Sequence, residues 1–99
     1  MSAKPLTVLA RVRAKPGKES EVLRELQSIL GPSRKDDGCL SYDLHQSQTD
    51  RVLFMFHENW VSRTHLDQHL SKPDLQATLK RLEPLVAEPP EITFWQQIG

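Results

Sequence analysis

The sequence is poor in the residues on which several classes of protein depend. It contains one cysteine, Cys39, so no disulfide can form within the chain, and we expect a cytoplasmic protein. Its four glycines stand alone, so no glycine-rich loop is available to hold the phosphates of a nucleotide cofactor. The longest apolar run near the N-terminus covers residues 6–10, far short of the roughly 20 residues that cross a membrane, so neither a signal peptide nor a membrane span is expected.

The sequence also has no excess of positive or negative charge. Thirteen Lys and Arg residues balance thirteen Asp and Glu residues, and the isoelectric point near 6.9 leaves no net field to attract nucleic acid or an anionic membrane. Charged residues make up 26% and hydrophobic residues 37% of the chain, which is ordinary for a folded protein. We therefore expect one domain over residues 1–99, without a nucleic-acid or membrane partner.

Alternation of apolar and polar residues with a period of two predicts strands. It runs over residues 6–14 and again over residues 39–47, where Leu40 and Tyr42 are expected on the same face. Residues 52–60 predict a third, more apolar strand. The short polar stretch between the second and third strands predicts that they pair as a hairpin.

Helical periodicity and capping residues predict the helices. Residues 22–30 place their apolar side chains on one helical face, and Gly31-Pro32 is expected to stop that helix. Ser62 is expected to cap a short helix that runs to Leu70. Ser71, with an acidic residue three positions later, resembles a capping box for a further helix, which Pro84 is expected to end or kink.

With a final strand over residues 91–98, the order is β-α-β-β-α-α-β. This order predicts an α+β, ferredoxin-like sandwich, with an antiparallel sheet and helices on one sheet face. The third strand is apolar on both sides, with Phe54 and Phe56 on one side and Leu53 and Met55 on the other. A face of the sheet without helices therefore needs another cover, and we expect the sheet of a second, identical subunit.

Three of the four histidines lie within residues 57–69. His57 and Glu58 begin like the H-E-x-x-H motif of zinc proteases, but Val61 stands where that motif needs its second histidine. His65 and His69 are spaced to share a helical face, yet no cysteine pair or matching carboxylate completes a ligand set. We expect no metal ion, and His69 also has an ordinary interpretation as an imidazole near the favourable end of a helix dipole.

Asn59 and Trp60 stand together at the end of the third strand. Trp60 is expected to be a core aromatic residue. The Asn59 amide costs free energy beside an apolar strand unless it is hydrogen-bonded, so it is either a local cap or a polar group aimed into a pocket. Because neighbours on an ideal strand point to opposite faces, both residues reach one pocket only if the strand ends or bulges there.

Three segments resemble the motifs of a known family. GCLSYDLHQS, FHENW and HLDQHLSKPDLQA are similar, in order and spacing, to G-C-L-x-Y-x-L, E-x-W and L-x-x-H-L-x-x-P-H of the antibiotic biosynthesis monooxygenase domain family. Asp74 departs from the pattern, because it replaces the histidine after the proline. The resemblance implies a homodimer whose two sheets pack into an α+β barrel, with a pocket between sheet and helices in each subunit.

The resemblance also implies a function. It implies a cofactor-independent monooxygenase that oxidises a small quinol-like or phenolic compound with O2, using neither metal nor flavin. In that role Asn59 would bind a substrate oxygen, Trp60 would form an apolar wall, and His69 or His45 would move protons. The alternatives within this fold are an isomerase of a small phosphorylated metabolite, of the autoinducer-2 processing type, and a non-catalytic dimer that binds a small molecule.

Haem-degrading relatives give a further alternative. They resemble one another in an asparagine on the first strand and an iron-ligating histidine on the helix after the third strand. Alignment with this chain places those positions at Ala10 and Leu79, which offer neither an amide nor a lone pair for iron. We therefore expect no haem.

Overall fold

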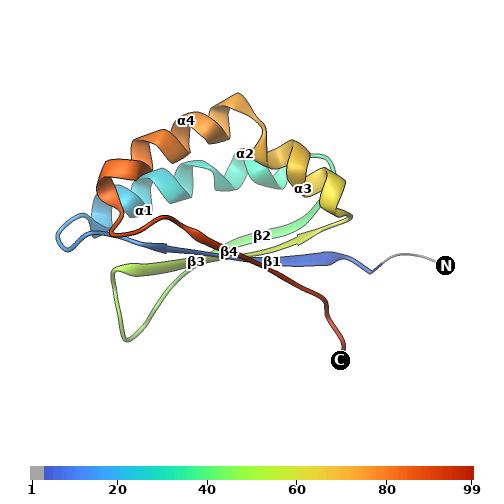
Figure 1. Ribbon diagram of the computed structural model, residues 1–99, viewed down its shortest axis with the longest axis horizontal. Coiled ribbons are helices and arrows are strands. Elements are labelled where there is room, and N and C mark those ends of the chain that lie inside the picture. Colours follow the sequence, from blue (N-terminus) through green and yellow to red (C-terminus); the bar gives the residue numbers. More distant parts are fainter. Residues whose placement is uncertain (1–3) are drawn as a thin grey trace.

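In the computed structural model, which describes residues 4–99, four strands form one antiparallel sheet and every helix lies on the same face of it (Figure 1). The strand order is β2-β3-β1-β4, which confirms the expected ferredoxin-like α+β fold. The elements in chain order are β1 (Leu6–Arg13), α1 (Glu19–Ser28), α2 (Leu30–Arg34), β2 (Cys39–Gln46), β3 (Leu53–Trp60), α3 (Arg63–Leu70), α4 (Pro73–Leu82), the 3₁₀ turn η1 (Glu83–Leu85) and β4 (Glu91–Trp95).

The register of the sheet fixes which side chains face the helices. β3 pairs with β1 along its whole length, from Leu6 opposite Trp60 to Arg13 opposite Leu53. Alternate residues of β3 are buried against the helices, beginning with Phe54. The residues between them lie half-buried on the other face of the sheet, which we call the open face because no helix covers it.

The predicted hairpin of β2 and β3 is confirmed, but its pattern is interrupted. A β-bulge lies between Cys39 and Ser41, so Leu40 is the extra residue opposite β3. Leu40 does not share the buried face with Tyr42, as the alternation predicted, and its side chain is 56% exposed. The prediction for Leu40 was wrong because a bulge shifts the alternation by one residue.

Two predicted helix boundaries differ from the structure. Gly31-Pro32 does not end the helical region. α1 ends earlier, at Ser28, and α2 begins at Leu30 and contains both residues. Proline is tolerated there because the first-turn N–H groups of a helix have no partner within it. Ser71 does not cap α4, which begins at Pro73, and instead donates its hydroxyl to the carbonyl oxygen of Gln68 at 2.8 Å.

The remaining helix signals are confirmed. The Ser62 hydroxyl accepts the backbone N–H of His65 at 3.3 Å and caps α3. α4 ends at Leu82, before Pro84, and the chain continues as a single 3₁₀ turn. None of the helices within residues 4–99 is both long enough and apolar enough to cross a membrane.

Candidate active site

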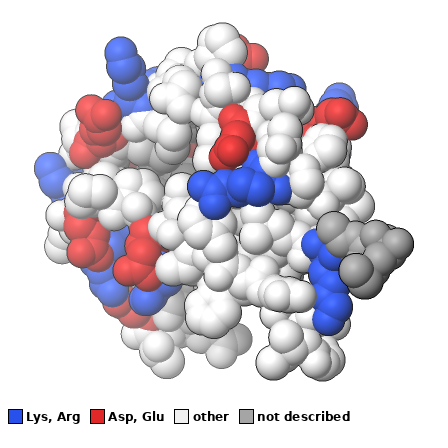
Figure 2. Space-filling model, turned by 45° about the vertical axis from the view of Figure 1, so that its right-hand side comes forward, with Lys and Arg blue, Asp and Glu red and all other residues white. Residues whose placement is uncertain are grey.

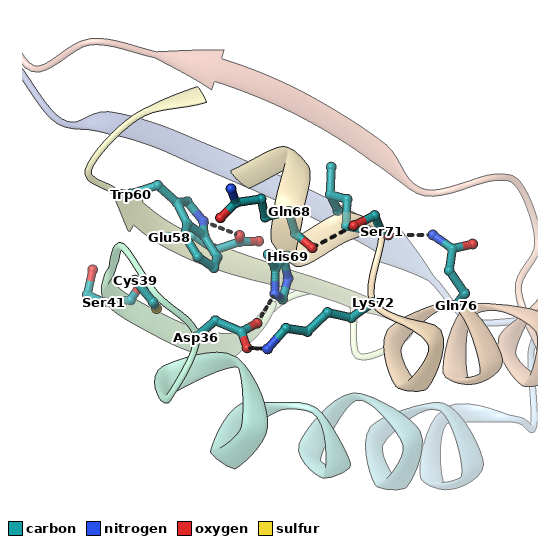
Figure 3. Close-up of polar contacts among 11 residues, drawn as sticks. Asp36, Cys39, Ser41, Glu58, Trp60, Gln68, His69, Ser71, Lys72 and Gln76 are labelled. Atoms are coloured by element: carbon teal, nitrogen blue, oxygen red, sulfur yellow. Dashed lines mark hydrogen bonds and ion pairs between the residues drawn. The ribbon is translucent and has the colours of Figure 1, made fainter. Parts of the chain in front are cut away.

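A carboxyl group lies among apolar side chains on the helix-covered face of β3. The alternation that buries Phe56 and Trp60 also buries Glu58, which is 4% exposed. The indole Nε1 of Trp60 donates to Oε1 of Glu58 at 2.9 Å (Figure 3). Burial raises the pKa of Glu58 to about 7, although the Trp60 hydrogen bond acts against this shift. Glu58 therefore exchanges a proton near neutral pH.

The sequence prediction did not include Glu58 among the candidate site residues. A signal was present, because Glu58 falls on the apolar side of the alternation, between Phe56 and Trp60. Charged residues are almost never fully buried without a partner, so a carboxylate in a core position is a candidate for function.

His69 lies in the last turn of α3 and packs on the same aromatic side chains. Its side chain is 3% exposed, and its ring centroid lies 4.7 Å from that of Trp60 and 5.4 Å from that of Tyr42. Its Nδ1 is 2.6 Å from Oδ2 of Asp36. Burial lowers the pKa of His69 and outweighs the opposite effect of the Asp36 carboxylate, so the ring is neutral at pH 7.

Asp36 reaches His69 from the loop between α2 and β2. Its side chain is 7% exposed, and its other oxygen, Oδ1, pairs with Nζ of Lys72 at the start of α4 (Figure 3). Burial opposes ionisation, but hydrogen bonds from Lys72 and His69 outweigh it and hold the pKa of Asp36 below its usual value. The sequence analysis did not connect Asp36 with His69 or Lys72, and no local pattern points to these contacts, because Asp36 lies 33 residues from His69 and 36 from Lys72.

Gly38 allows this loop to approach α3 closely. Its φ of 79° is in the left-handed region that favours glycine. A Cβ at this position would lie 2.3 Å from Cγ of His65. The carbonyl of Gly38 also accepts the N–H of Val61 at 2.8 Å, so the loop that carries Asp36 is fixed against the segment between β3 and α3.

Glu58 and His69 line one small cavity between the sheet and the helices. The cavity has a volume of about 60 Å³, and its wall also includes Tyr42 and aliphatic side chains from α1 and α4. Ala10 and Leu79, the positions aligned with the haem-degrading relatives, lie in the same wall. This space holds about two water molecules but not a phenol ring.

A larger apolar hollow adjoins the cavity. It has a volume of about 590 Å³ and lies between α4 and the segment that enters β4. Leu79, Leu82, Pro90 and Ile92 line both spaces, and we call these four residues the mouth. The hollow and the cavity with Glu58 and His69 therefore lie on opposite sides of the mouth.

The structure separates the four residues predicted for the site. Trp60 and His69 lie together on the helix-covered face, whereas Asn59 and His45 lie on the open face. Asn59 accepts the Thr7 hydroxyl at 2.6 Å and donates to Oγ of Ser41 at 2.9 Å. β3 has no bulge at this point, so Asn59 stays on the open face, where it links three strands.

The two histidines of α3 do not come together with further ligand side chains in the described part of the chain. Among residues 4–99, no group of three or more His, Cys, Asp and Glu side chains is arranged to hold a metal ion. His65 and His69 face different partners, since Nε2 of His65 lies 3.6 Å from Asp37 and Nδ1 of His69 contacts Asp36. On the face drawn in Figure 2, acidic and basic side chains are interspersed, as expected from the balanced charge.

Comparison with known proteins identifies relatives over nearly the whole chain. The chain is 32% identical over 92 residues to the uncharacterized protein sll1783 of Synechocystis, and the match spans 93% of this chain but only 63% of that protein. It is 33% identical over 89 residues to the "Putative monooxygenase Rv0793" of Mycobacterium tuberculosis, covering 90% of this chain and 87% of that one. It is 31% identical over 83 residues to the "Probable quinol monooxygenase YgiN" of Escherichia coli, and this match covers 73% of this chain and 79% of that one.

A solved structure agrees with these matches. The crystal structure of PA3566 from Pseudomonas aeruginosa superimposes with a TM-score of 0.93 at 31% sequence identity, covering 100% of this chain and 99% of that one. Residues 5–81 match the sequence profile of the family described as antibiotic biosynthesis monooxygenase. The chain therefore belongs to the antibiotic biosynthesis monooxygenase family.

Proposed function

We propose that the chain is a cofactor-independent monooxygenase that oxidises a small quinol-like or phenolic compound with O2. The proposal rests on one observation, that Glu58 and His69 both line the same largely apolar cavity. A carboxyl group with a pKa of about 7 and a neutral imidazole are both suited to accept a phenolic proton near neutral pH. The quinol monooxygenase named among the relatives supports the choice of substrate class.

The proposed reaction begins with removal of a phenolic proton by Glu58 or His69. The resulting phenolate is electron-rich and passes electrons to O2. For a quinol, one oxygen atom enters the ring and the other leaves as water, so that the substrate supplies all four electrons and becomes a hydroxyquinone. This balance closes without a further reductant, and the chain's part is to bind the ring, to exclude water and to take the proton.

The sizes of the two spaces suggest how a substrate binds. The ring fits the outer hollow against the mouth, where the aliphatic side chains of Leu79, Leu82 and Ile92 offer an apolar surface. The inner cavity of about 60 Å³ accommodates a hydroxyl group or an O2 molecule. His69 keeps the role expected from the sequence, and Glu58 takes the place of Asn59 and His45. Trp60 does not line the cavity, so its proposed role is to hold Glu58 and His69 from behind.

Oxygen uptake tests the proposal. We expect metal-free and flavin-free protein to consume O2 with at least one member of a panel of substituted hydroquinones. Glu58→Gln and His69→Ala should each lower kcat by about 100-fold, as loss of a general base does. Glu21→Gln is the matched control, because the Glu21 side chain is 50% exposed on α1 and lines neither the cavity nor the hollow. Absence of uptake with every hydroquinone would contradict the proposal.

Two other outcomes would point to the alternative functions. Turnover that proceeds without O2 would favour an isomerase, and ligand-induced thermal stabilisation without product would favour a binding protein. The isomerase of a phosphorylated metabolite is the less favoured, because no Lys or Arg of residues 4–99 lines the cavity, and two of the basic side chains outside it are paired with carboxylates. Arg13 pairs with Asp50 at 2.7 Å and Lys72 pairs with Asp36.

We further propose that the chain forms a homodimer through the open face. Leu53 and Met55 lie half-buried on this face, and the side chain of Trp95 is 55% exposed. An exposed apolar sheet face of this kind is unusual in a monomer. A second copy placed on it by a twofold axis would cover the apolar side chains of both subunits.

A further inference from the structure

Three separate chain segments converge behind the His69 ring, on the side away from the cavity. Asp36 comes from the loop after α2, His69 from the last turn of α3, and Lys72 from the residue that precedes α4 (Figure 3). They border an outer groove of about 210 Å³, and His69 lines both this groove and the inner cavity. His69 therefore lies between the cavity and the groove, together with Ile29 and Leu75.

The charge state of Asp36 determines which nitrogen of His69 carries the proton. Hydrogen bonds from Lys72 and His69 keep Asp36 ionised despite its burial, and a carboxylate can only accept hydrogen bonds. The proton in the 2.6 Å contact must then lie on Nδ1 of His69. Because burial keeps the ring neutral, Nε2 carries a lone pair.

The surroundings of Nε2 place this lone pair next to open space. Within residues 4–99, every side-chain nitrogen or oxygen atom without accessible surface has a hydrogen-bond partner. No hydrogen bond joins Nε2 of His69 to these residues, so this atom keeps accessible surface. Asp36 lines the groove but not the cavity, so the Nδ1 that contacts it lies toward the groove, and we assign Nε2, on the other side of the ring, to the inner cavity.

We propose that Asp36 is a positioning residue, which holds His69 with Nδ1 protonated so that Nε2 acts as the base in the cavity. The inference rests on the proposed function, and it specifies the atom that takes the phenolic proton. The O–H bond of the phenol breaks, Nε2 gains the proton, and the electron pair stays on the phenolate oxygen. The Asp36 carboxylate stabilises the imidazolium that forms, and Lys72 holds the carboxylate in place.

Other charged or titratable groups also lie near His69 and need to be distinguished from Asp36. Glu58 on β3 lines the same cavity, the Tyr42 phenol on β2 packs on the ring, and Lys72 lies beside the groove. Burial, followed by the Glu58 carboxylate, raises the pKa of Tyr42, so its phenol stays protonated at neutral pH. Glu58 is thus the other candidate for accepting the phenolic proton, and Glu58→Gln serves as a comparison with the Asp36 variants.

Nitrogen NMR of histidine-labelled full-length protein measures the tautomer directly and needs no substrate. We expect His69 in the wild type to carry its proton on Nδ1, and in Asp36→Ala to shift toward a mixture with the Nε2-protonated form. Asp37→Asn and Glu58→Gln should leave the His69 signals at the wild-type tautomer. Asp37→Asn is the matched control because Asp37 is the neighbouring aspartate and faces His65 instead. Protonation of Nε2 in the wild type, or no change in Asp36→Ala, would overturn the inference.

Kinetics of Asp36→Asn provide a second readout, in a variant that keeps the size of the side chain. We expect kcat to fall by about 10- to 100-fold, with KM changed less than about threefold. Because the Asp36 carboxylate raises the pKa of His69, its removal should move the acid limb of the pH profile of kcat to lower pH. An unchanged kcat and an unmoved acid limb would overturn the role of Asp36 while leaving the proposed function intact. If no hydroquinone is oxidised, the proposed function fails, and the tautomer measurement still decides whether Asp36 positions His69.

Discussion

The imidazole of His69 packs on the indole of Trp60 with 4.7 Å between ring centroids, and this contact joins the last turn of α3 to the end of β3. The same indole donates its N–H to Glu58. Trp60 is thus in contact with both groups that are proposed to accept a proton. Its substitution should affect the stability of the fold and the acid–base properties of the cavity together.

Trp60→Phe should lower the free energy of unfolding by about 1–3 kcal/mol, because a buried carboxyl group loses its hydrogen-bond donor. The same change should raise the pKa of Glu58 further, since the Trp60 hydrogen bond lowers it. Urea denaturation measures the first effect. Val61→Ala is the control, because Val61 is the neighbouring residue and is 46% exposed. Equal losses for the two variants would contradict the importance of burial at Trp60.

Glu58 should make stability depend on pH. Its pKa is raised from 4.5 to about 7, so the folded protein retains a proton that the unfolded chain has already released. Protonated Glu58 therefore contributes to stability below about pH 4.5, and this contribution of about 3 kcal/mol is lost as the pH rises toward 7. Glu58→Gln does not titrate, so its free energy of unfolding should increase relative to that of the wild type between pH 4.5 and 7. A constant difference across that range would show that Glu58 titrates at its ordinary pKa.

The homodimer is expected to depend on the open face. Sedimentation of the wild type at micromolar concentration should give twice the 11.4 kDa mass of the chain. Met55→Glu, which places a charge on the open face of β3, should give monomers. Gln48→Glu adds the same charge in the exposed turn between β2 and β3 and should leave the mass of the assembly unchanged. A wild-type mass near 11.4 kDa would contradict the homodimer.

Leu26→Ala should reduce the free energy of unfolding by about 2–5 kcal/mol, because Leu26 is 1% exposed in the core beneath α1. Leu40→Ala removes the same atoms from the bulge residue of β2, which is 56% exposed, and should cost less than about 0.5 kcal/mol. Chemical denaturation of both variants provides the comparison. A larger loss at Leu40 than at Leu26 would mean that the assignment of buried and exposed faces is wrong.

The period of two predicted much of the fold, because strands with one buried face must alternate. It also indicates that neighbours such as Asn59 and Trp60 lie on opposite faces of β3, as the structure has them. Grouping these two residues into one site relied on the family resemblance, which implied a role in one pocket for both. The correct partner for Trp60 on its own face is two positions away, at Glu58.

Other features depend on long-range contacts or on a single inserted residue, which periodicity does not encode. Asp36 contacts His69 because Gly38 lets the loop approach α3, and nothing in the residues around Asp36 indicates that partner. The bulge at Leu40 changes the face of one residue without altering the surrounding pattern. Tertiary packing decides both, and sequence reasoning could not place them.

The mouth and the proton-accepting groups come from different stretches of the chain. Leu79 and Leu82 belong to α4 and Ile92 to β4, whereas Glu58 and His69 belong to β3 and α3. The side chains of the entrance and the groups proposed to accept the proton can therefore change by separate substitutions. Under the proposed function, descendants of one ancestral chain could diverge in the compounds that they admit while they retain the same response to pH.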